Sequence, residues 1–131
     1  MCHLTGDTVE PVPSDSRGPR LARELFDLSA CATHNPHTLD AARLLVSEVV
    51  TNAVRYGAPP IHIEIRCIEH IGLRVAVSDA NPIPPTPLVT DPHDESGRGM
   101  ALVELFSDEW GVVATHGGKQ VWFRFNPART S

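Results

Sequence analysis

The segment SEVVTNAVRYG, residues 47–57, combines the pattern of a buried helix with two polar side chains. Glu48 and Asn52 lie four residues apart, about one helical turn, among Val and Ala residues. At about 100° per residue both fall at the edge of the predicted apolar face. That face centres on Leu39, Ala42, Val46, Val49 and Ala53. Such an edge can line a ligand site or be a solvated flank of the helix, and this helix alone leaves both readings open.

Three helices are predicted. The one that carries the polar pair begins near Thr38, a suitable N-cap, and stops at Gly57. An earlier helix is predicted in PRLARELFDLSA, residues 19–30, with Pro19 at its start and leucines at helical spacing. These leucines are Leu21, Leu25 and Leu28. The segment GRGMALVELFSD, residues 97–108, starts the third helix.

Four strands are predicted from alternating apolar and polar residues. IHIEIRC (61–67) and LRVAVSD (73–79) are separated by a turn short enough for a hairpin. Their inward-facing residues are Ile61, Ile63, Ile65, Cys67, Leu73, Val75 and Val77. EWGVVATHGGKQVWFRF (109–125) reads as a second hairpin that turns at Gly117 and Gly118.

The order of these elements predicts an α+β fold. Helices gathered around two hairpins indicate a two-layer sandwich, with the helices on one face of a mainly antiparallel sheet. Residues 81–96 contain five prolines and are predicted to form neither helix nor central strand. We expect a loose N-terminal arm over residues 1–18, one domain over 19–126 and a short tail over 127–131.

Composition narrows the class of partner. The chain has 131 residues with 41% hydrophobic and 21% charged, which suits one globular domain with one sizeable core. The formal net charge is −5 and no run of Lys or Arg stands out, which disfavours direct binding to nucleic acid or to an anionic membrane. A protein partner or a small ligand is the better expectation.

The cysteines and the N-terminal sequence indicate a cytoplasmic protein. Cys2, Cys31 and Cys67 are odd in number and lack CxxC spacing, which favours reduced thiols over a disulfide framework. The first residues have neither a basic start nor an apolar run, so no signal peptide is expected. No stretch of about 18 apolar residues occurs, so no membrane-spanning helix is expected either.

Two further sequence features have the chemistry of a phosphate or nucleotide site. Asp79 ends an alternating strand, where a side chain can reach a ligand, although a lone Asp there is commonly a turn residue or a cap. In ESGRGM, Gly97 and Gly99 flank Arg98 just before the third helix. Glycines let the backbone approach a phosphate, and a helix start supplies free N–H groups. The segment is not a P-loop, because no GK[ST] follows.

The order and spacing of these features resemble the GHKL superfamily of ATP-binding domains. The segments GRGMALVELFSDEWGV and GGKQVWFRF look like those of its bacterial anti-sigma-factor serine/threonine kinases. The resemblance covers roughly residues 20–125 and implies a Bergerat-type ATP-binding fold. It also implies ATP and Mg²⁺ as cofactors.

The resemblance also implies residue roles. Glu48 would be the general base, or orient the attacking hydroxyl, and Asn52 would bind Mg²⁺, which prefers hard oxygen ligands. Asp79 would accept a hydrogen bond from the adenine amino group. Residues 81–96 would form a lid over the nucleotide. The remaining nucleotide contacts would come from Asn81, Gly97, Arg98, Gly99 and Met100, with the glycines and the arginine around the phosphates.

Three positions depart from the pattern of the family. Asn81 stands where glycine usually follows the adenine-binding Asp, and Tyr56 replaces the usual His before Gly57. Gln120 stands where a Thr near the adenine is common. Asn tolerates positive φ better than most residues, so the turn at Asn81 can be retained. Together the three changes are compatible with weakened nucleotide binding.

The resemblance implies a transferase that regulates transcription. The leading hypothesis is a serine/threonine-protein kinase that holds a sigma factor and phosphorylates a Ser or Thr of an anti-sigma-factor antagonist. Arg20 matches a partner-binding position, and related kinases form homodimers. Lys119 could approach a phosphate but reads better as an ordinary turn residue. The alternative hypothesis is a non-catalytic protein-binding module with a weakened or lost ATP site.

Overall fold

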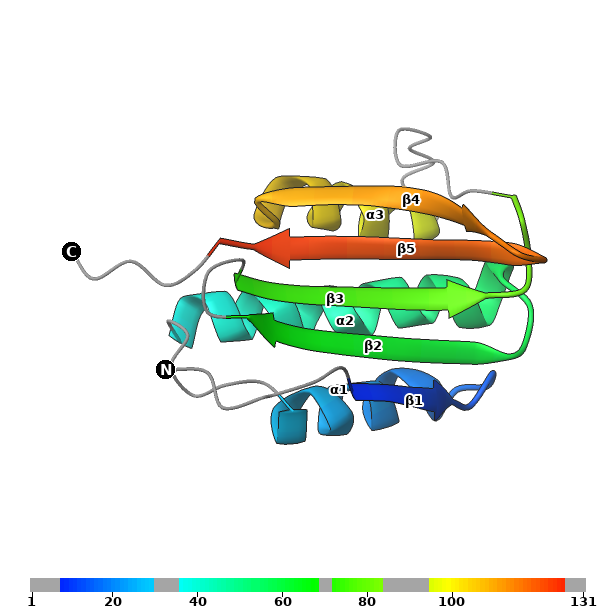
Figure 1. The fold of residues 1–131 in the computed structure, drawn as a ribbon, viewed down its shortest axis with the longest axis horizontal. Helices are drawn as coiled ribbons and strands as arrows, with labels where there is room; N and C mark the ends of the chain where they lie inside the picture. Colours follow the sequence, from blue (N-terminus) through cyan, green and yellow to red (C-terminus); the bar gives the residue numbers. More distant parts are fainter. Residues whose placement is uncertain (1–7, 30–35, 69–71, 84–94, 127–131) are drawn as a thin grey trace.

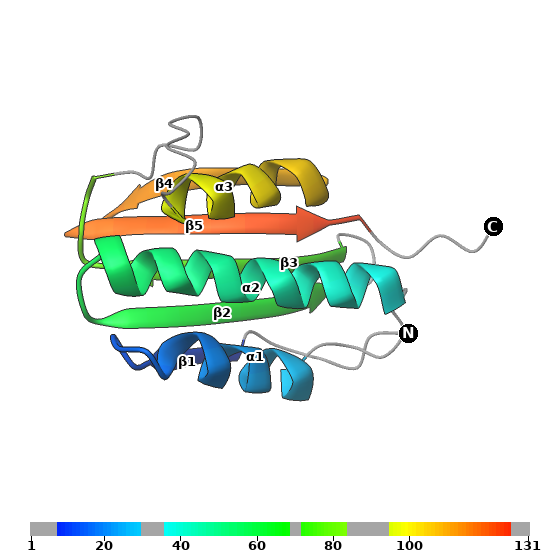
Figure 2. The same ribbon diagram turned by 180° about the vertical axis from the view of Figure 1, so that it is seen from behind.

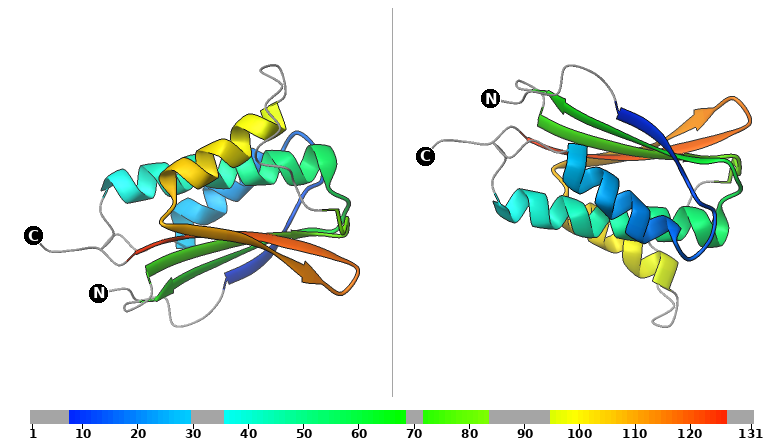
Figure 3. Two further views of the ribbon diagram at one scale, coloured as in Figure 1. Left: turned by 90° about the horizontal axis from the view of Figure 1, so that it is seen from above. Right: turned by 90° about the horizontal axis from the view of Figure 1, so that it is seen from below.

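The computed structural model describes residues 8–29, 36–68, 72–83 and 95–126, with only the backbone at positions 8, 68 and 95–99. The described part is a two-layer α+β sandwich, as the sequence predicts (Figure 3). In chain order the elements are β1 (Thr8–Val12), α1 (Gly18–Ser29), α2 (Pro36–Tyr56), β2 (Ile61–Ile68), β3 (Gly72–Asp79), α3 (Glu95–Phe106), β4 (Glu109–Thr115) and β5 (Gly118–Phe125).

All strand pairs in the sheet are antiparallel, and the strand order is β1-β2-β3-β5-β4 (Figure 1). The register opposes Ile63 to Val77 and Val77 to Val121, so apolar side chains meet in a row across three strands. The predicted alternation in β2 and β3 is confirmed. The largest fully buried side chains include Phe26, Phe123, Leu45, Ile61 and Ile63. Each such side chain stabilises the fold by about 1.5–3 kcal/mol on burial.

Helix α2 lies over the middle of the sheet between α1 and α3 (Figure 2). Its predicted apolar face is buried, apart from the half-buried Leu39, and is widened by Leu45 and Val50. The helix begins at Pro36 and not near Thr38, because proline suits the first helical position, where no N–H is needed. At the other end, the Gly57 N–H donates to the Ala53 carbonyl over 2.9 Å. The predicted stop at Gly57 is therefore confirmed.

The N-terminal segment departs from its prediction. The sequence predicts a loose arm over residues 1–18, but Thr8–Val12 form edge strand β1, which pairs with β2. An edge strand tolerates Pro11, because its outer side needs no N–H donor. Residues 1–7 and the predicted tail, 127–131, lie outside the described part of the chain.

Helix α1 also packs differently from its leucine pattern. The buried positions include Ala22 and Phe26, four residues apart, whereas Leu28 is 84% exposed. The leucine spacing predicts the helix, and Leu25 packs against the core. Ala22 is small enough to let α1 approach its neighbours, and Phe26 fills the space beside it.

Two shorter predictions are shifted. Helix α3 begins at Glu95, so Gly97 and Gly99 lie within the helix, as its third and fifth residues, and not before it. The second hairpin turns at His116 and Gly117, while Gly118 already belongs to β5 and opposes Thr115. Gly117 takes the positive φ that the turn needs, 84°.

Cys67 corrects the expectation of reduced thiols. It lies on the core side of β2 and is 3% exposed. The structure has this residue disulfide-bonded, so the prediction is wrong for this cysteine. Cys2 and Cys31 lie outside the described residues. Among the described helices, none is both long enough and apolar enough to cross a membrane.

Candidate nucleotide site

Three chain segments that carry predicted site residues meet at one end of the molecule. The C-terminal ends of α2 and β3 and the N-terminal end of α3 all lie there (Figures 1 and 2). The backbone joins two of them directly, because the Ala80 N–H donates to the Ala58 carbonyl over 2.8 Å. The sequence order alone does not show this proximity, which follows from the antiparallel packing of the elements.

Asp79 is the last residue of β3 and faces the helix layer. Its side chain is 2% exposed. Gly57 lies directly against it: a Cβ on Gly57 would come within 2.7 Å of the Asp79 Cγ and 2.8 Å of Oδ2. Gly57 does not adopt a positive φ, so its value here is close approach and not an unusual backbone conformation.

Lys119, the second residue of the neighbouring strand β5, pairs with this carboxylate. Its Nζ lies 3.1 Å from Asp79 Oδ1 and 3.1 Å from Oδ2, and it also donates to the Asn81 carbonyl over 2.9 Å. The Lys119 side chain is only 7% exposed. The prediction of an ordinary turn residue is therefore wrong. Asp79 and Lys119 are directly opposed in the β3–β5 register, which explains their contact.

Asn81 links the loop after β3 to the end of α2. Its N–H donates to Asp79 Oδ1 over 2.7 Å, and its Nδ2 donates to the Tyr56 carbonyl over 2.7 Å. Its Oδ1 accepts from the Ile83 N–H over 3.1 Å. No non-glycine residue of the described part has a positive φ, so Asn81 does not reproduce a glycine-type turn as suggested above. Its hydrogen bonds instead connect Asp79 to the end of α2.

Glu48 and Asn52 occupy successive turns of α2, as predicted. Glu48 is half-buried, and Asn52 is 9% exposed. This edge of α2 is therefore half-buried at Glu48 and buried at Asn52. It is not the fully solvated flank that the sequence left open. The Asn52 amide oxygen is a hard donor of the kind that Mg²⁺ accepts.

The residues expected to surround the phosphates lie at the start of α3. Gly97, Arg98 and Gly99 are described by their backbone only and are the third, fourth and fifth residues of that helix. Of these three residues, only Gly97 has an N–H group without a partner within the helix, because Glu95 is the first helical residue. Met100 is 1% exposed and belongs to the hydrophobic core, so any contact with a nucleotide would have to come from its backbone. Of the predicted lid, residues 84–94 lie outside the described residues.

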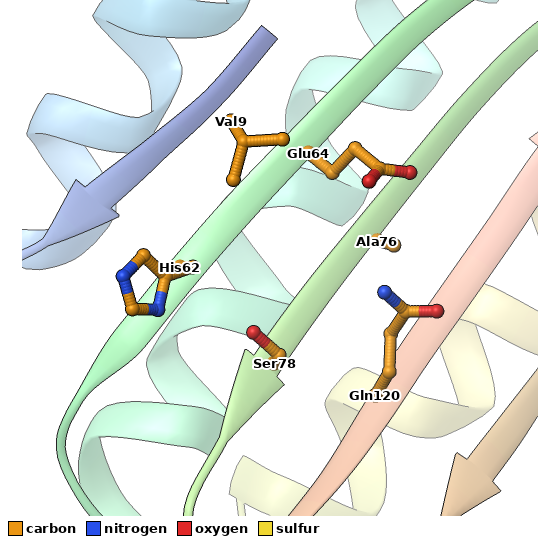
Figure 4. Close-up of a pocket in the computed structure, with 6 residues that line it drawn as sticks. All are labelled: Val9, His62, Glu64, Ala76, Ser78 and Gln120. Carbon is orange, nitrogen blue, oxygen red and sulfur yellow. The ribbon is translucent and has the colours of Figure 1, made fainter. Parts of the chain in front are cut away.

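Gln120 does not lie near Asp79. Strand alternation turns it to the open face of the sheet, where it lines a hollow with five other residues (Figure 4). These are Val9, His62, Glu64, Ala76 and Ser78. Lys119, one residue earlier, therefore occupies the place beside the predicted base-binding carboxylate. Counting inward-facing positions back from Phe125 and Phe123 through Val121 is the sequence signal that finds it.

Arg20 lies on the exposed surface of α1. It is in the first turn, away from the buried Ala22 and Phe26. Its predicted role in partner binding stays a prediction.

An α+β sandwich with an acid and an amide on its central helix and an Asp at the end of an inner strand defines a GHKL-type domain. The chain matches the family model described as "Histidine kinase-like ATPase domain" over residues 13–125 and belongs to that family. Membership implies an ATP site.

A solved structure with a similar fold is that of the RsbU and RsbW domains of Rv1364c from Mycobacterium tuberculosis. The TM-score is 0.68 at 17% sequence identity, a likeness of fold alone. The match covers 97% of this chain and 35% of that chain, so this chain spans about a third of it. No curated protein matches the sequence at a significant level.

Proposed function

We propose that this chain is an ATP-dependent protein serine/threonine kinase that regulates a sigma factor. Its substrate would be a Ser or Thr hydroxyl of an anti-sigma-factor antagonist. The observation that carries the proposal is the pair Glu48, half-buried, and Asn52, buried, in the C-terminal half of α2, the helix whose C-terminal end lies at the same end of the molecule as the C-terminal end of β3. Family membership supports the ATP site, and the fold likeness to the RsbW-containing protein supports this branch of the family.

Glu48 and Asn52 would divide the work of phosphoryl transfer. Bound Mg-ATP supplies the γ-phosphoryl group and the charge compensation for its transfer. Asn52 would hold the metal through its amide oxygen. The oxygen of the substrate hydroxyl would bond to the γ-phosphorus while the bond between that phosphorus and ADP breaks. Glu48 would accept the proton that this hydroxyl loses. The half-buried position of Glu48 keeps its carboxylate close to the helix while leaving it reachable.

Asp79 would recognise the adenine amino group. A carboxylate accepts hydrogen bonds only, so it suits an N–H₂ group and discriminates against a carbonyl oxygen. Gly57 and Asn81 position this carboxylate from two sides.

The protein partners would be the antagonist and the sigma factor, with a second copy of this chain as a homodimer. Arg20 on the exposed face of α1 would contribute to partner docking. The net charge of −5 fits a protein partner better than nucleic acid.

Calorimetric titration with Mg-ATP tests the ATP site first. We expect binding by the parent chain and weaker binding by Asn52→Ala and Asp79→Asn, with each variant checked for folding by near-UV circular dichroism. Gln120→Ala is the matched control, because Gln120 lies on the opposite face of the sheet. The ATP-dependent proposal is wrong if a folded parent chain binds no Mg-ATP. The alternative, a protein-binding module that does not use ATP, would then be favoured.

Transfer of labelled γ-phosphate to a purified antagonist tests the kinase reaction itself. The label should appear on Ser or Thr of the antagonist and require both Mg²⁺ and this chain. ATP binding without transfer to any antagonist that the chain binds would retain the ATP site and refute the kinase.

A further inference from the structure

The carboxylate of Asp79, which is expected to bind the adenine base, already contacts other residues of the protein. Lys119 Nζ contacts both Asp79 oxygens at 3.1 Å, and Asn81 N–H occupies Oδ1 at 2.7 Å. Gly57 lies against Oδ2. With its side chain 2% exposed, Asp79 presents almost no surface to a ligand in this conformation.

The ammonium group of Lys119 is held as completely as the carboxylate. Its Nζ donates hydrogen bonds to Asp79 Oδ1 and to the Asn81 carbonyl, and it also lies 3.1 Å from Asp79 Oδ2 in the same ion pair. Charge-assisted hydrogen bonds of this kind are stronger than neutral ones, more so at low exposure. A base that needs Asp79 as its acceptor must therefore displace a well-satisfied ion pair.

We propose that Lys119 competes with the nucleotide base for Asp79 and so sets the affinity of the site. The inference rests on the proposed ATP site. It adds that Lys119, a residue of the protein itself, lowers the affinity of that site for the nucleotide. In the nucleotide-free protein Lys119 covers the carboxylate. When the base binds, the ammonium leaves Asp79, which the four-carbon side chain of lysine permits by rotation.

The competition predicts the size of the effect on binding. If Lys119 covers Asp79 in about 90% of nucleotide-free molecules, the apparent Kd is about ten times that of the open form. Lys119→Met keeps most of the side-chain length and removes the ammonium, so its Kd for Mg-ATP should be lower than the parent's by about that factor. Gln120→Met is the matched control on the opposite face and should leave the Kd unchanged.

The sequence offers a direct second readout, because Lys119 is the only lysine of the chain. Protein labelled with ¹⁵N-lysine therefore gives a single side-chain ammonium signal. Without nucleotide, the buried, hydrogen-bonded group should exchange slowly and be observed by NMR. Added Mg-ATP should shift or abolish this signal in proportion to the bound fraction. This measurement uses the parent chain and does not depend on the folding of a variant.

The outcomes separate this inference from the proposed function. Mg-ATP that binds the parent as tightly as Lys119→Met, or that leaves the lysine signal unchanged at saturation, overturns the competition and retains the ATP site. A lysine signal already typical of a solvated ammonium without nucleotide also overturns it. If neither the parent nor folded Lys119→Met binds Mg-ATP, both the inference and the ATP site are refuted.

Discussion

The Asn81 side chain fastens the end of α2 to the loop after β3, because its Nδ2 donates to the Tyr56 carbonyl over 2.7 Å. That carbonyl belongs to the last residue of α2, where helix carbonyls lack partners within the helix. Glycine, which the family usually has at this position, could not make this bond. The departure at Asn81 is therefore also a gain in hydrogen bonding at the site.

Asn81→Ala should lower the free energy of unfolding. It removes the bond to Tyr56 and the one that Oδ1 accepts from Ile83 N–H, and each partly exposed bond contributes about 0.5–1 kcal/mol. We expect a loss of about 1–2 kcal/mol in urea denaturation. Asn126→Ala is the control, because its side chain accepts a bond from Arg124 at an exposed site and should cost less than about 0.5 kcal/mol. Equal urea midpoints for Asn81→Ala and Asn126→Ala would contradict a stabilising role for the hydrogen bonds of Asn81.

Gly57→Ala should destabilise the protein for a steric reason. The added Cβ would meet the Ala53 carbonyl oxygen at 2.6 Å and the Asp79 carboxyl carbon at 2.7 Å. The first is helix backbone and the second is held by Lys119, so neither yields easily. We expect a loss of about 1–3 kcal/mol by chemical denaturation, and weaker Mg-ATP binding because Asp79 is displaced.

Gly117→Ala separates steric from torsional cost. Nothing lies within 4 Å of a Cβ there, but Gly117 has a φ of 84°, which costs an alanine about 1 kcal/mol. Stability should fall by that amount while Mg-ATP binding stays at the parent's value. If Gly117→Ala impaired binding as much as Gly57→Ala, the effect of Gly57 could not be assigned to contact with Asp79.

Much of the fold follows from local sequence patterns, because alternation and helical spacing are properties of neighbouring residues. The inward faces of β2 and β3 and the polar edge of α2 are examples. The contact between Asp79 and Lys119 was not predicted. It depends on the register of two strands whose paired residues lie 40 positions apart in sequence.

Other errors arose where tertiary contacts outweigh local signals. The segment Thr8–Val12 contains a proline and lies among Ser, Asp and Pro residues, which are typical of loops. It nevertheless forms a strand, because it pairs with the edge of β2. In α1, the leucine spacing correctly predicts the helix but does not identify its most buried positions, since Ala22 and Phe26 are buried whereas Leu28 is 84% exposed.

The Asp15 carboxyl group should titrate well below its usual range. The side-chain hydrogen bonds from Arg17, followed by the Arg17 backbone N–H, lower the pKa of Asp15 from 3.8 to about 2. A lowered pKa means that the contact stabilises the fold above about pH 4 and that this contribution is lost as the pH falls toward 2. An NMR titration should show the low midpoint in the parent. Arg17→Gln should return it toward 3.8, and an unchanged midpoint would rule out Arg17 as the cause.

Glu48→Gln should separate catalysis from binding. The amide keeps the shape of the side chain but cannot accept the hydroxyl proton, so phosphoryl transfer should fall by about 10²–10⁴-fold. Mg-ATP affinity should be retained, because the metal and base contacts are assigned to Asn52 and Asp79. Glu24→Gln, the same change on the exposed side of α1, should keep the parent's rate of transfer. Transfer at the parent's rate by Glu48→Gln would exclude Glu48 as the base. Loss of Mg-ATP binding would instead place Glu48 among the residues that hold the nucleotide.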